Sequence, residues 1–150
     1  MIIKKCRNCN SSKLNFLFTL GNLAFTGKFP NRFKDIPRDI LKLVMCDKCK
    51  LVQLDRNFNK RYLYGKDYGY RTGINQTMTN HVKSVALNVS KKIKLKTGDA
   101  VLDIASNDGT LLNSYSNEGI IKVGIDPVIN KYKKYYKKIN YYFPNFFSAN

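Results

Sequence analysis

This chain of 150 residues has room for one ordinary domain or two small ones, and its hydrophobic content of 43% is that of a globular protein. No apolar run approaches the ~18 residues that a membrane-spanning helix needs, and residues 1–6 contain no apolar segment of signal-peptide length. We therefore predict a cytoplasmic protein without a membrane partner, in which paired cysteines are more often metal ligands than disulfides.

The formal net charge is +17 at pH 7, which by itself favours a phosphate-bearing partner such as nucleic acid. However, Lys, Asn, Ile, Tyr and Phe are all abundant, as expected when an A/T-rich genome biases codon use. The lysines are also spread along the whole chain, apart from a cluster within residues 131–138. We favour the compositional explanation and expect no specific nucleic-acid partner.

Residues 1–60 contain all four cysteines as two Cys-x-x-Cys pairs, Cys6 with Cys9 and Cys46 with Cys49. The gap between the pairs is longer than the ~15–20 residues of a minimal zinc ribbon. Each pair can form a knuckle whose sulfurs point to one centre, and two knuckles supply the tetrahedral sulfur coordination that suits Zn²⁺. The pattern predicts a structural zinc site in preference to free thiols or a redox pair. Four protein ligands close such a site, so we assign the metal no catalytic role.

Residues 61–96 begin with a Tyr/Gly-rich loop over 62–70 and continue as a predicted helix, because apolar residues recur from Met78 to Ile93 at spacings of three and four. A tyrosine hydroxyl can position a substrate hydroxyl, and a histidine can shuttle protons near neutral pH. Two alternatives stay open, because tyrosines also pack domain junctions and a single helix histidine is more often structural. The catalytic candidates in this segment are Tyr68, Tyr70 and His81.

Residues 97–150 begin with a predicted strand, turn, helix and strand. One apolar run ends at Asp103, a helix starts near Thr110, and a second apolar run ends at Asp126. This order is typical of a nucleotide-binding unit, in which the second carboxylate accepts ribose hydroxyls and helix N–H groups face the polar end of the ligand. An ordinary βαβ unit with a polar turn is the alternative.

The predicted turn is poor in glycine. Ala105, Asn107 and Gly109 stand where the usual nucleotide-binding pattern has three glycines. Asn is the best non-glycine residue for a left-handed backbone conformation, so we expect the turn to form.

A Lys/Tyr-rich helix and a strand-like segment over residues 140–147 are predicted after residue 127. A parallel sheet needs both faces covered and more than three strands to bury them. We therefore expect this chain to be the amino-terminal part of a longer protein, with a truncated second domain.

These motifs, in this order, resemble the sugar-nucleotide C-methyltransferases, which are S-adenosylmethionine-dependent enzymes with an amino-terminal zinc-binding domain. The resemblance implies an α+β zinc-binding domain followed by the start of a Rossmann-like α/β methyltransferase domain. It also implies methyl transfer to a ring carbon of a nucleoside-diphosphate sugar made for surface polysaccharides or antibiotics. The matching segments span essentially the whole chain: Leu20–Gly21, Thr26–Pro30, Cys46–Leu54, Tyr68–Gly73, Met78 with His81, Leu102–Leu112 and Gly124–Pro127.

The resemblance also implies roles for individual residues. A tyrosine of the Tyr68–Tyr70 pair would face the sugar, with His81 as a further catalytic candidate. Two positions depart from the family pattern, since Ala105 and Lys50 stand where glycine is common. The residues implied in binding S-adenosylmethionine are Asp103, Ala105, Asn107, Asp108, Gly109, Asp126 and Pro127.

In the family the catalytic base is placed in a carboxyl-terminal half that this chain does not include, so we expect this polypeptide alone to be inactive. Two other functions remain open. A zinc-ribbon nucleic-acid-binding module would explain the charge and the cysteines, but it leaves Asp103 and Asp126 unexplained. A non-catalytic remnant of the methyltransferase would keep the fold without the activity.

Overall fold

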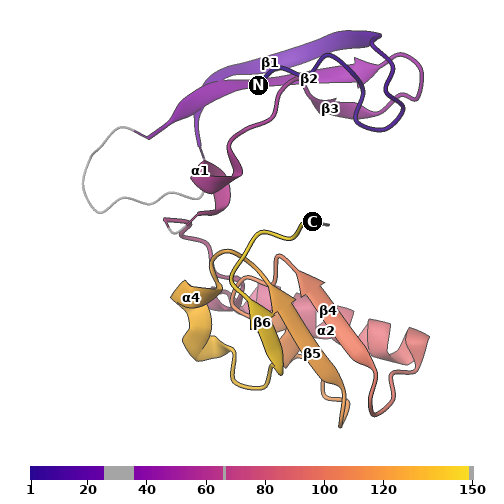
Figure 1. The fold of residues 1–150 in the computed structure, drawn as a ribbon, viewed down its shortest axis with the longest axis vertical. Coiled ribbons are helices and arrows are strands. Elements are labelled where there is room, and N and C mark those ends of the chain that lie inside the picture. The colour runs from indigo at the N-terminus through magenta and orange to yellow at the C-terminus, as the bar shows by residue number, and fades with distance from the viewer. Residues whose placement is uncertain (26–35, 66, 149–150) are drawn as a thin grey trace. The chain divides into compact units, whose positions relative to one another are not determined.

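The computed structural model describes residues 1–25, 36–65 and 67–148, so the segment Thr26–Pro30 of the resemblance lies outside the described residues. The chain forms two compact units, Met1–Tyr68 and Gly69–Asn150 (Figure 1). The boundary between the units lies within the segment predicted over residues 61–96. Helix α1 (Lys60–Tyr64) belongs to the first unit and helix α2 (Gln76–Ile93) to the second. Within the described ranges, no helix combines the length and apolar character that crossing a membrane requires.

The first unit contains a three-stranded antiparallel sheet in the order β1-β2-β3. Strand β1 spans Leu14–Ala24, β2 spans Arg38–Cys46 and β3 spans Val52–Leu54. The pairing of β1 with β2 is irregular at Gly21, whose φ of 75° is a conformation that glycine adopts without strain.

The apolar core of the first unit is small. Among its described residues, the buried hydrophobic side chains are Cys6, Val44 and Cys46. In contrast, β1 exposes Phe16 and Leu20 by more than half of their surface. Two of the three core residues are cysteines, so the stability of this unit depends on what the cysteines bind.

The second unit contains a parallel sheet in the order β4-β5-β6, as expected from the sequence. Strand β4 spans Ala100–Ile104, β5 spans Ile121–Ile125 and β6 spans Tyr141–Phe143. Helix α3, between β4 and β5, is a single turn over Thr110–Asn113. The remaining elements are the 3₁₀ turn η1 (Thr72–Ile74), helix α4 (Ile129–Tyr132) and the 3₁₀ turn η2 (Lys133–Tyr135).

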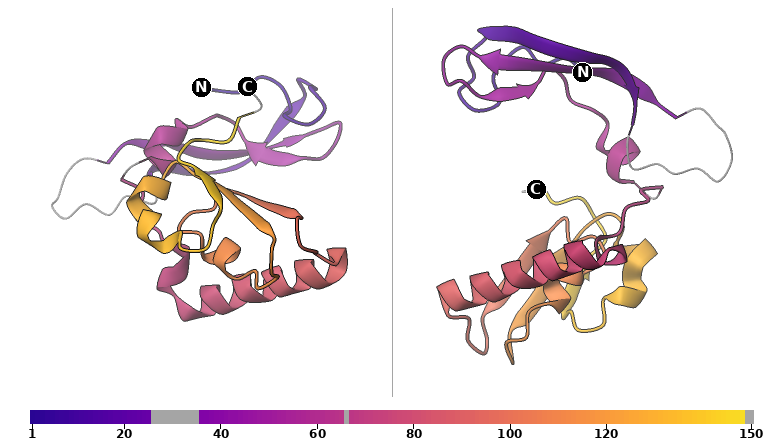
Figure 2. Two further views of the ribbon diagram at one scale, coloured as in Figure 1. Left: turned by 60° about the horizontal axis from the view of Figure 1, so that its bottom comes forward. Right: turned by 180° about the vertical axis from the view of Figure 1, so that it is seen from behind.

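Helix α2 runs along one face of the parallel sheet (Figure 2). The predicted helix is confirmed, but the ends of its apolar pattern, Met78 and Ile93, are exposed. Its fully buried residue is Ala86, which was outside that pattern and packs against Tyr115 and Ile120. Val89 of the helix and Val101 of β4 pack around this cluster. The helix and the loop after α3 therefore bury one side of β4.

The opposite face of the parallel sheet is apolar and exposed. The pairing places Leu102 beside Val123 and Tyr141 in one row, and Ile104 beside Ile125 and Phe143 in the next. The outer members of both rows are about half exposed, from 49% at Ile104 to 59% at Tyr141. Parallel sheets usually have both faces covered by other elements. In the described part of this unit, only the face that packs against α2 is covered.

Candidate functional site

The two cysteine pairs lie on knuckles with the same backbone geometry. The N–H of Asn10 donates to the carbonyl of Cys6 at 3.0 Å, and the N–H of Lys50 donates to the carbonyl of Cys46 at 2.9 Å. Asn10 and Lys50 are both left-handed, with φ of 58° and 61°. This conformation favours glycine and asparagine, which explains why a glycine after the second knuckle is common in the family that the chain resembles.

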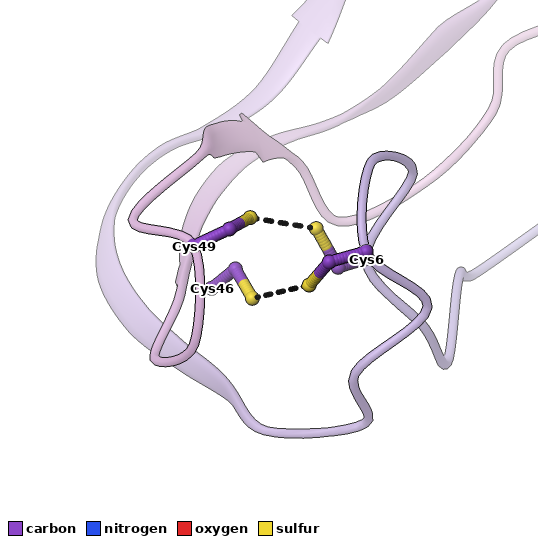
Figure 3. A group of neighbouring side chains, drawn as sticks. Cys6, Cys46 and Cys49 are labelled. Carbon is purple, nitrogen blue, oxygen red and sulfur yellow. Dashed lines mark hydrogen bonds between the residues drawn. The ribbon is translucent and has the colours of Figure 1, made fainter.

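The structure brings the four predicted metal ligands together (Figure 3). The sulfurs of Cys6 and Cys49 lie 3.5 Å apart, as do those of Cys9 and Cys46, and all four lie within 4.8 Å of one another. In a tetrahedral zinc site with Zn–S bonds of ~2.3 Å, the sulfurs are about 3.8 Å apart. The four cysteines are thus positioned to bind one metal ion, with a geometry and donor set consistent with zinc.

Backbone N–H groups favour thiolates on the second knuckle. A hydrogen bond from the backbone of Leu51 lowers the pKa of Cys49 to about 6, and one from the backbone of Cys49 lowers the pKa of Cys46. At Cys9 the backbone of Ser11 lowers the pKa, but burial and the neighbouring thiols outweigh it and raise the pKa to about 11. Because the thiolate is the form that binds metal, these backbone N–H groups favour metal binding at the second knuckle.

Strand β3 holds the first knuckle in place. The side-chain oxygen of Gln53 accepts from the backbone N–H of Arg7 at 3.1 Å, and the Arg7 guanidinium donates to the carbonyl of Leu54 at 2.7 Å. Gln53 is buried, so this hydrogen bond is shielded from water. These contacts fix the first knuckle against the strand that follows the second knuckle. Neither Arg7 nor Gln53 was predictable from the sequence, because both contacts join residues that are far apart in the chain.

The glycine-poor turn of the second unit forms with a left-handed residue at each of the three expected positions. The φ angles are 65° at Ala105, 50° at Asn107 and 75° at Gly109. Asn107 and Gly109 adopt this conformation readily, whereas an alanine there costs roughly 1 kcal/mol relative to glycine. The expectation that the turn forms without three glycines is confirmed.

The backbone N–H groups of this turn are engaged within the unit. Ala105 and Ser106 donate to the carbonyl of Ile125, and Asn107 donates to the Asp126 carboxylate. The N–H of Thr110, the first residue of α3, donates to the Asp108 carboxylate at 3.1 Å. The expectation that helix N–H groups face a ligand is therefore wrong at Thr110, and α3 is only one turn long.

The two strand-end carboxylates lie at the same edge of the parallel sheet. Asp103 pairs with Gly124 of β5, and Asp126 follows β5 directly. Asp126 is 7% exposed, and its two oxygens accept from the backbone N–H groups of Asn107 at 3.0 Å and Val128 at 2.9 Å. An ionised carboxylate has about four acceptor positions, so Asp126 retains capacity for two further donors. Pro127, the next residue, is partly exposed.

The Asp103 carboxyl is hard to ionise. Burial raises its pKa to about 6, and the negative charge of Asp126 adds to the rise. A raised native pKa means that the folded state holds this proton more tightly than the unfolded chain, whose aspartates titrate near 3.9. The second unit is therefore expected to lose stability as the pH rises from about 4 to above 6.

Asp103→Asn is expected to stabilise the second unit by about 1–2 kcal/mol at pH 7.5 and to have little effect at pH 4, after allowance for partial solvent screening. Denaturant unfolding monitored through the Ala86 amide in α2 would measure this difference at both pH values. The matched control is Asp99→Asn, which changes a carboxyl that accepts from the N–H of Lys96 in an exposed turn of the same unit. Parallel pH profiles for wild type and Asp103→Asn would contradict the prediction.

Two side chains of the turn hold the tyrosine-bearing segment, residues 70–73. Asp108 is fully buried, and its Oδ2 accepts from the Arg71 guanidinium at 3.0 Å and from the Gly73 N–H at 2.9 Å. The Asn107 side chain accepts from the N–H of Thr72 at 2.9 Å and donates to the carbonyl of Tyr70 at 3.2 Å. We call these four hydrogen bonds the clamp. Both residues were expected to contact the cofactor, and the structure turns both toward residues 70–73.

Two tyrosines that the sequence did not single out support the same turn. The Tyr136 hydroxyl donates to the carbonyl of Asn107 at 3.0 Å and lies 2.8 Å from the Ser106 hydroxyl. Burial raises the pKa of Tyr136 well above its usual range. The Tyr132 hydroxyl donates to the carbonyl of Tyr70 at 3.0 Å. Their only sequence signal was the Tyr-rich composition of the predicted helix after residue 127.

The three catalytic candidates divide between the two units. Tyr68 closes the first unit, where its ring lies 5.6 Å from that of Tyr64, whereas Tyr70 and His81 belong to the second unit. Tyr70 is 40% exposed beside the clamp, and His81 is exposed on α2.

A cavity of about 390 Å³ lies beside the clamp in the second unit. Arg71, which stacks at 4.5 Å from the centre of the Tyr135 ring, forms part of its wall, together with Thr110 and Lys137. The predicted site residues thus divide into a metal site in one unit and a strand-edge site in the other.

Comparison with known proteins relates both parts of the chain to methyltransferases. Residues 6–64 match the family model Methyltransf_13, described as "Putative zinc binding domain". A C-methyltransferase, NovU of Streptomyces niveus, is 25% identical over 131 residues, an alignment that covers 85% of this chain and 31% of that protein. The chain therefore spans about a third of the length of this relative.

Proposed function

We propose that this chain belongs to a sugar C-methyltransferase-related family with an amino-terminal zinc-binding domain. It would contribute the first cofactor-binding elements of an S-adenosylmethionine-dependent enzyme that acts on a nucleoside-diphosphate sugar. The second unit is then the start of a Rossmann-like domain. The exposed apolar face of its sheet supports this proposal, because further elements of a larger α/β domain would cover it.

One observation carries the proposal: the parallel pairing of β4 with β5 brings a left-handed turn and Asp126 to the same sheet edge. Ligands of open α/β sheets bind at the carboxyl ends of the strands. The remaining acceptor positions of Asp126 suit the two hydroxyls of a ribose, since such charge-assisted hydrogen bonds are short and strong. An ordinary structural turn does not require a buried carboxylate with unused acceptor capacity.

The proposed function gives each site residue a distinct role. S-adenosylmethionine, when bound, supplies an electrophilic methyl group. Asp126 would hold the ribose, and the exposed Ala105 would let the turn approach the ligand closely. Tyr70 would position a hydroxyl of the sugar through its phenol, a role that depends on orientation. The four-cysteine metal site would stabilise the first unit and take no part in methyl transfer.

An NMR titration of the zinc-loaded chain with S-adenosylhomocysteine tests this proposal, because it detects dissociation constants even near 1 mM. The amides of Asn107 and Val128, which donate to Asp126, are expected to shift most. The knuckle amides of Asn10 and Lys50 serve as internal controls and should not move. Absence of shifts at Asn107 and Val128 at several millimolar ligand would refute the cofactor assignment.

A nucleic-acid-binding module is the competing function, and the net charge of +17 is the observation that favours it. We expect duplex DNA binding to be weak, independent of sequence and lost at moderate salt, because counterion release is then its only driving force. Fluorescence anisotropy with labelled duplexes at 50 and 200 mM salt measures this directly. A sequence-preferring complex that survives 200 mM salt would support the nucleic-acid function instead.

A further inference from the structure

We propose that Asp108 is a positioning residue and not a cofactor ligand: it fixes the tyrosine-bearing segment, residues 70–73, to the turn, so that binding at the turn also orders Tyr70. The first half of this proposal stands on the geometry of the second unit alone. The second half, coupling to the cofactor, rests on the proposed function.

The hydrogen-bonding capacity of Asp108 is already used. Its Oδ2 accepts from Arg71 and Gly73, and its Oδ1 accepts from the N–H and the hydroxyl of Thr110. A carboxylate has about four acceptor positions, and these four donors occupy them. With none of its surface exposed, Asp108 has neither the access nor the lone pairs to bind a ligand. Asp126, with two engaged positions, differs from it in this respect.

The fit at residue 73 is specific for a backbone without a side chain. A Cβ at Gly73 would lie 2.6 Å from the Thr110 hydroxyl and 2.9 Å from Asp108 Oδ2. The φ of Gly73 is −81°, which any residue can adopt, so the requirement for glycine is steric and not conformational. Glycine therefore lets this segment approach the carboxylate closely.

The clamp determines where Tyr70 lies. The carbonyl of Tyr70 accepts from the Asn107 side chain and from the Tyr132 hydroxyl, and the next residue, Arg71, is held by Asp108. Arg71 is further restrained by stacking on the Tyr135 ring. The turn and Tyr132 thus hold the carbonyl of Tyr70 and the residues that follow it. A ligand that stabilises the turn also stabilises this segment, because the two share one hydrogen-bonded network.

Residue-resolved amide hydrogen exchange of the zinc-loaded 150-residue chain tests the first half. In Asp108→Asn the N–H of Gly73 is expected to exchange at least tenfold faster than in wild type, with Ala86 in α2 unchanged. Asp99→Asn is the matched control and should leave Gly73 protected. Equal Gly73 exchange in wild type and Asp108→Asn would overturn the positioning role.

Two further variants keep the test decisive if Asp108→Asn unfolds the unit. Gly73→Ala inserts a methyl group into the clamp and should speed exchange at Thr72 at least tenfold without removing any polar group. Arg71→Gln should restore part of the Gly73 protection when combined with Asp108→Asn, because a neutral pair replaces an unpaired guanidinium. Unchanged exchange at Thr72 in Gly73→Ala, or no rescue by Arg71→Gln, would contradict the clamp.

The second half is tested by adding S-adenosylhomocysteine. In wild type the ligand should slow exchange at Thr72 and Gly73 at least threefold, and in Asp108→Asn it should bind at the turn without this effect. Binding to wild type without slower exchange would overturn the coupling alone. Failure of the ligand to bind wild type would instead refute the proposed function, while the ligand-free comparison of wild type with Asp108→Asn still decides the positioning role.

Discussion

Replacing Cys46 by Ser is expected to unfold the first unit while the second unit stays folded. The described part of the first unit buries only Cys6, Val44 and Cys46 as hydrophobic residues, so little free energy of folding comes from apolar burial. Structural zinc supplies roughly 10–16 kcal/mol in small zinc-dependent peptides, which exceeds the stability of a typical domain of this size. Loss of one thiolate from a four-sulfur site therefore removes the main stabilising contribution. The second unit keeps its own core around Ala86 and Ile120.

Elemental analysis, thiol titration and NMR of the β1–β2 amides would measure this effect. Wild type should contain one equivalent of zinc, and Cys46→Ser should lose both the metal and the dispersed amide signals of β1 and β2. The matched control is Lys48→Ser, an exposed substitution within the same knuckle that leaves all four thiols in place. Purified wild type with well below one equivalent of metal and four free thiols, or a folded metal-free Cys46→Ser unit, would contradict the account.

Asp126→Ala is expected to weaken the binding of S-adenosylhomocysteine at least tenfold. The carboxylate has two unused acceptor positions, and each charge-assisted hydrogen bond to a ribose hydroxyl contributes about 1.5–3 kcal/mol. The same substitution removes the acceptors for Asn107 and Val128, so the turn should also become less ordered. NMR titration gives the affinity, and the knuckle amides report that the zinc-binding unit is still folded.

A change in affinity has to be separated from general loss of the turn. Asp99→Asn is the comparison, because it alters an exposed carboxyl of the same unit but leaves the Asn107 and Val128 acceptors intact. The ligand affinity of Asp99→Asn should stay within threefold of wild type. Equal binding by wild type and Asp126→Ala would refute the ribose-binding role.

The zinc site was predictable from sequence because its determinants are local. A Cys-x-x-Cys pair closes its own knuckle, and the residue after it, Asn10 or Lys50, takes the left-handed conformation that ends the turn. The same holds for the turn at 105–109, where Asn107 and Gly109 signal a left-handed backbone. At the knuckles and at this turn, the backbone conformation is determined by residues that are neighbours in the sequence.

The clamp and the hydrogen bonds between Arg7 and strand β3 were not predictable, because they join residues far apart in the chain. Asp108 contacts Arg71 across 37 positions, and Arg7 contacts Gln53 across 46. A polar residue in a turn looks the same in sequence whether it faces a ligand or another segment. The sequence therefore indicated cofactor-facing roles for Asn107 and Asp108, and only the three-dimensional contacts reveal their hydrogen bonds to residues 70–73.

We propose that the Asp126 carboxylate recognises the ribose of an adenosyl cofactor. The most direct measurement compares S-adenosylhomocysteine with its 2′-deoxy counterpart, by NMR titration against wild type and Asp126→Ala. Removing one hydroxyl from the ligand should cost wild type about tenfold in affinity, equivalent to roughly 1.4 kcal/mol, and should cost Asp126→Ala almost nothing. An equal loss of affinity in both proteins would show that the hydroxyl does not contact Asp126, and would contradict the claim.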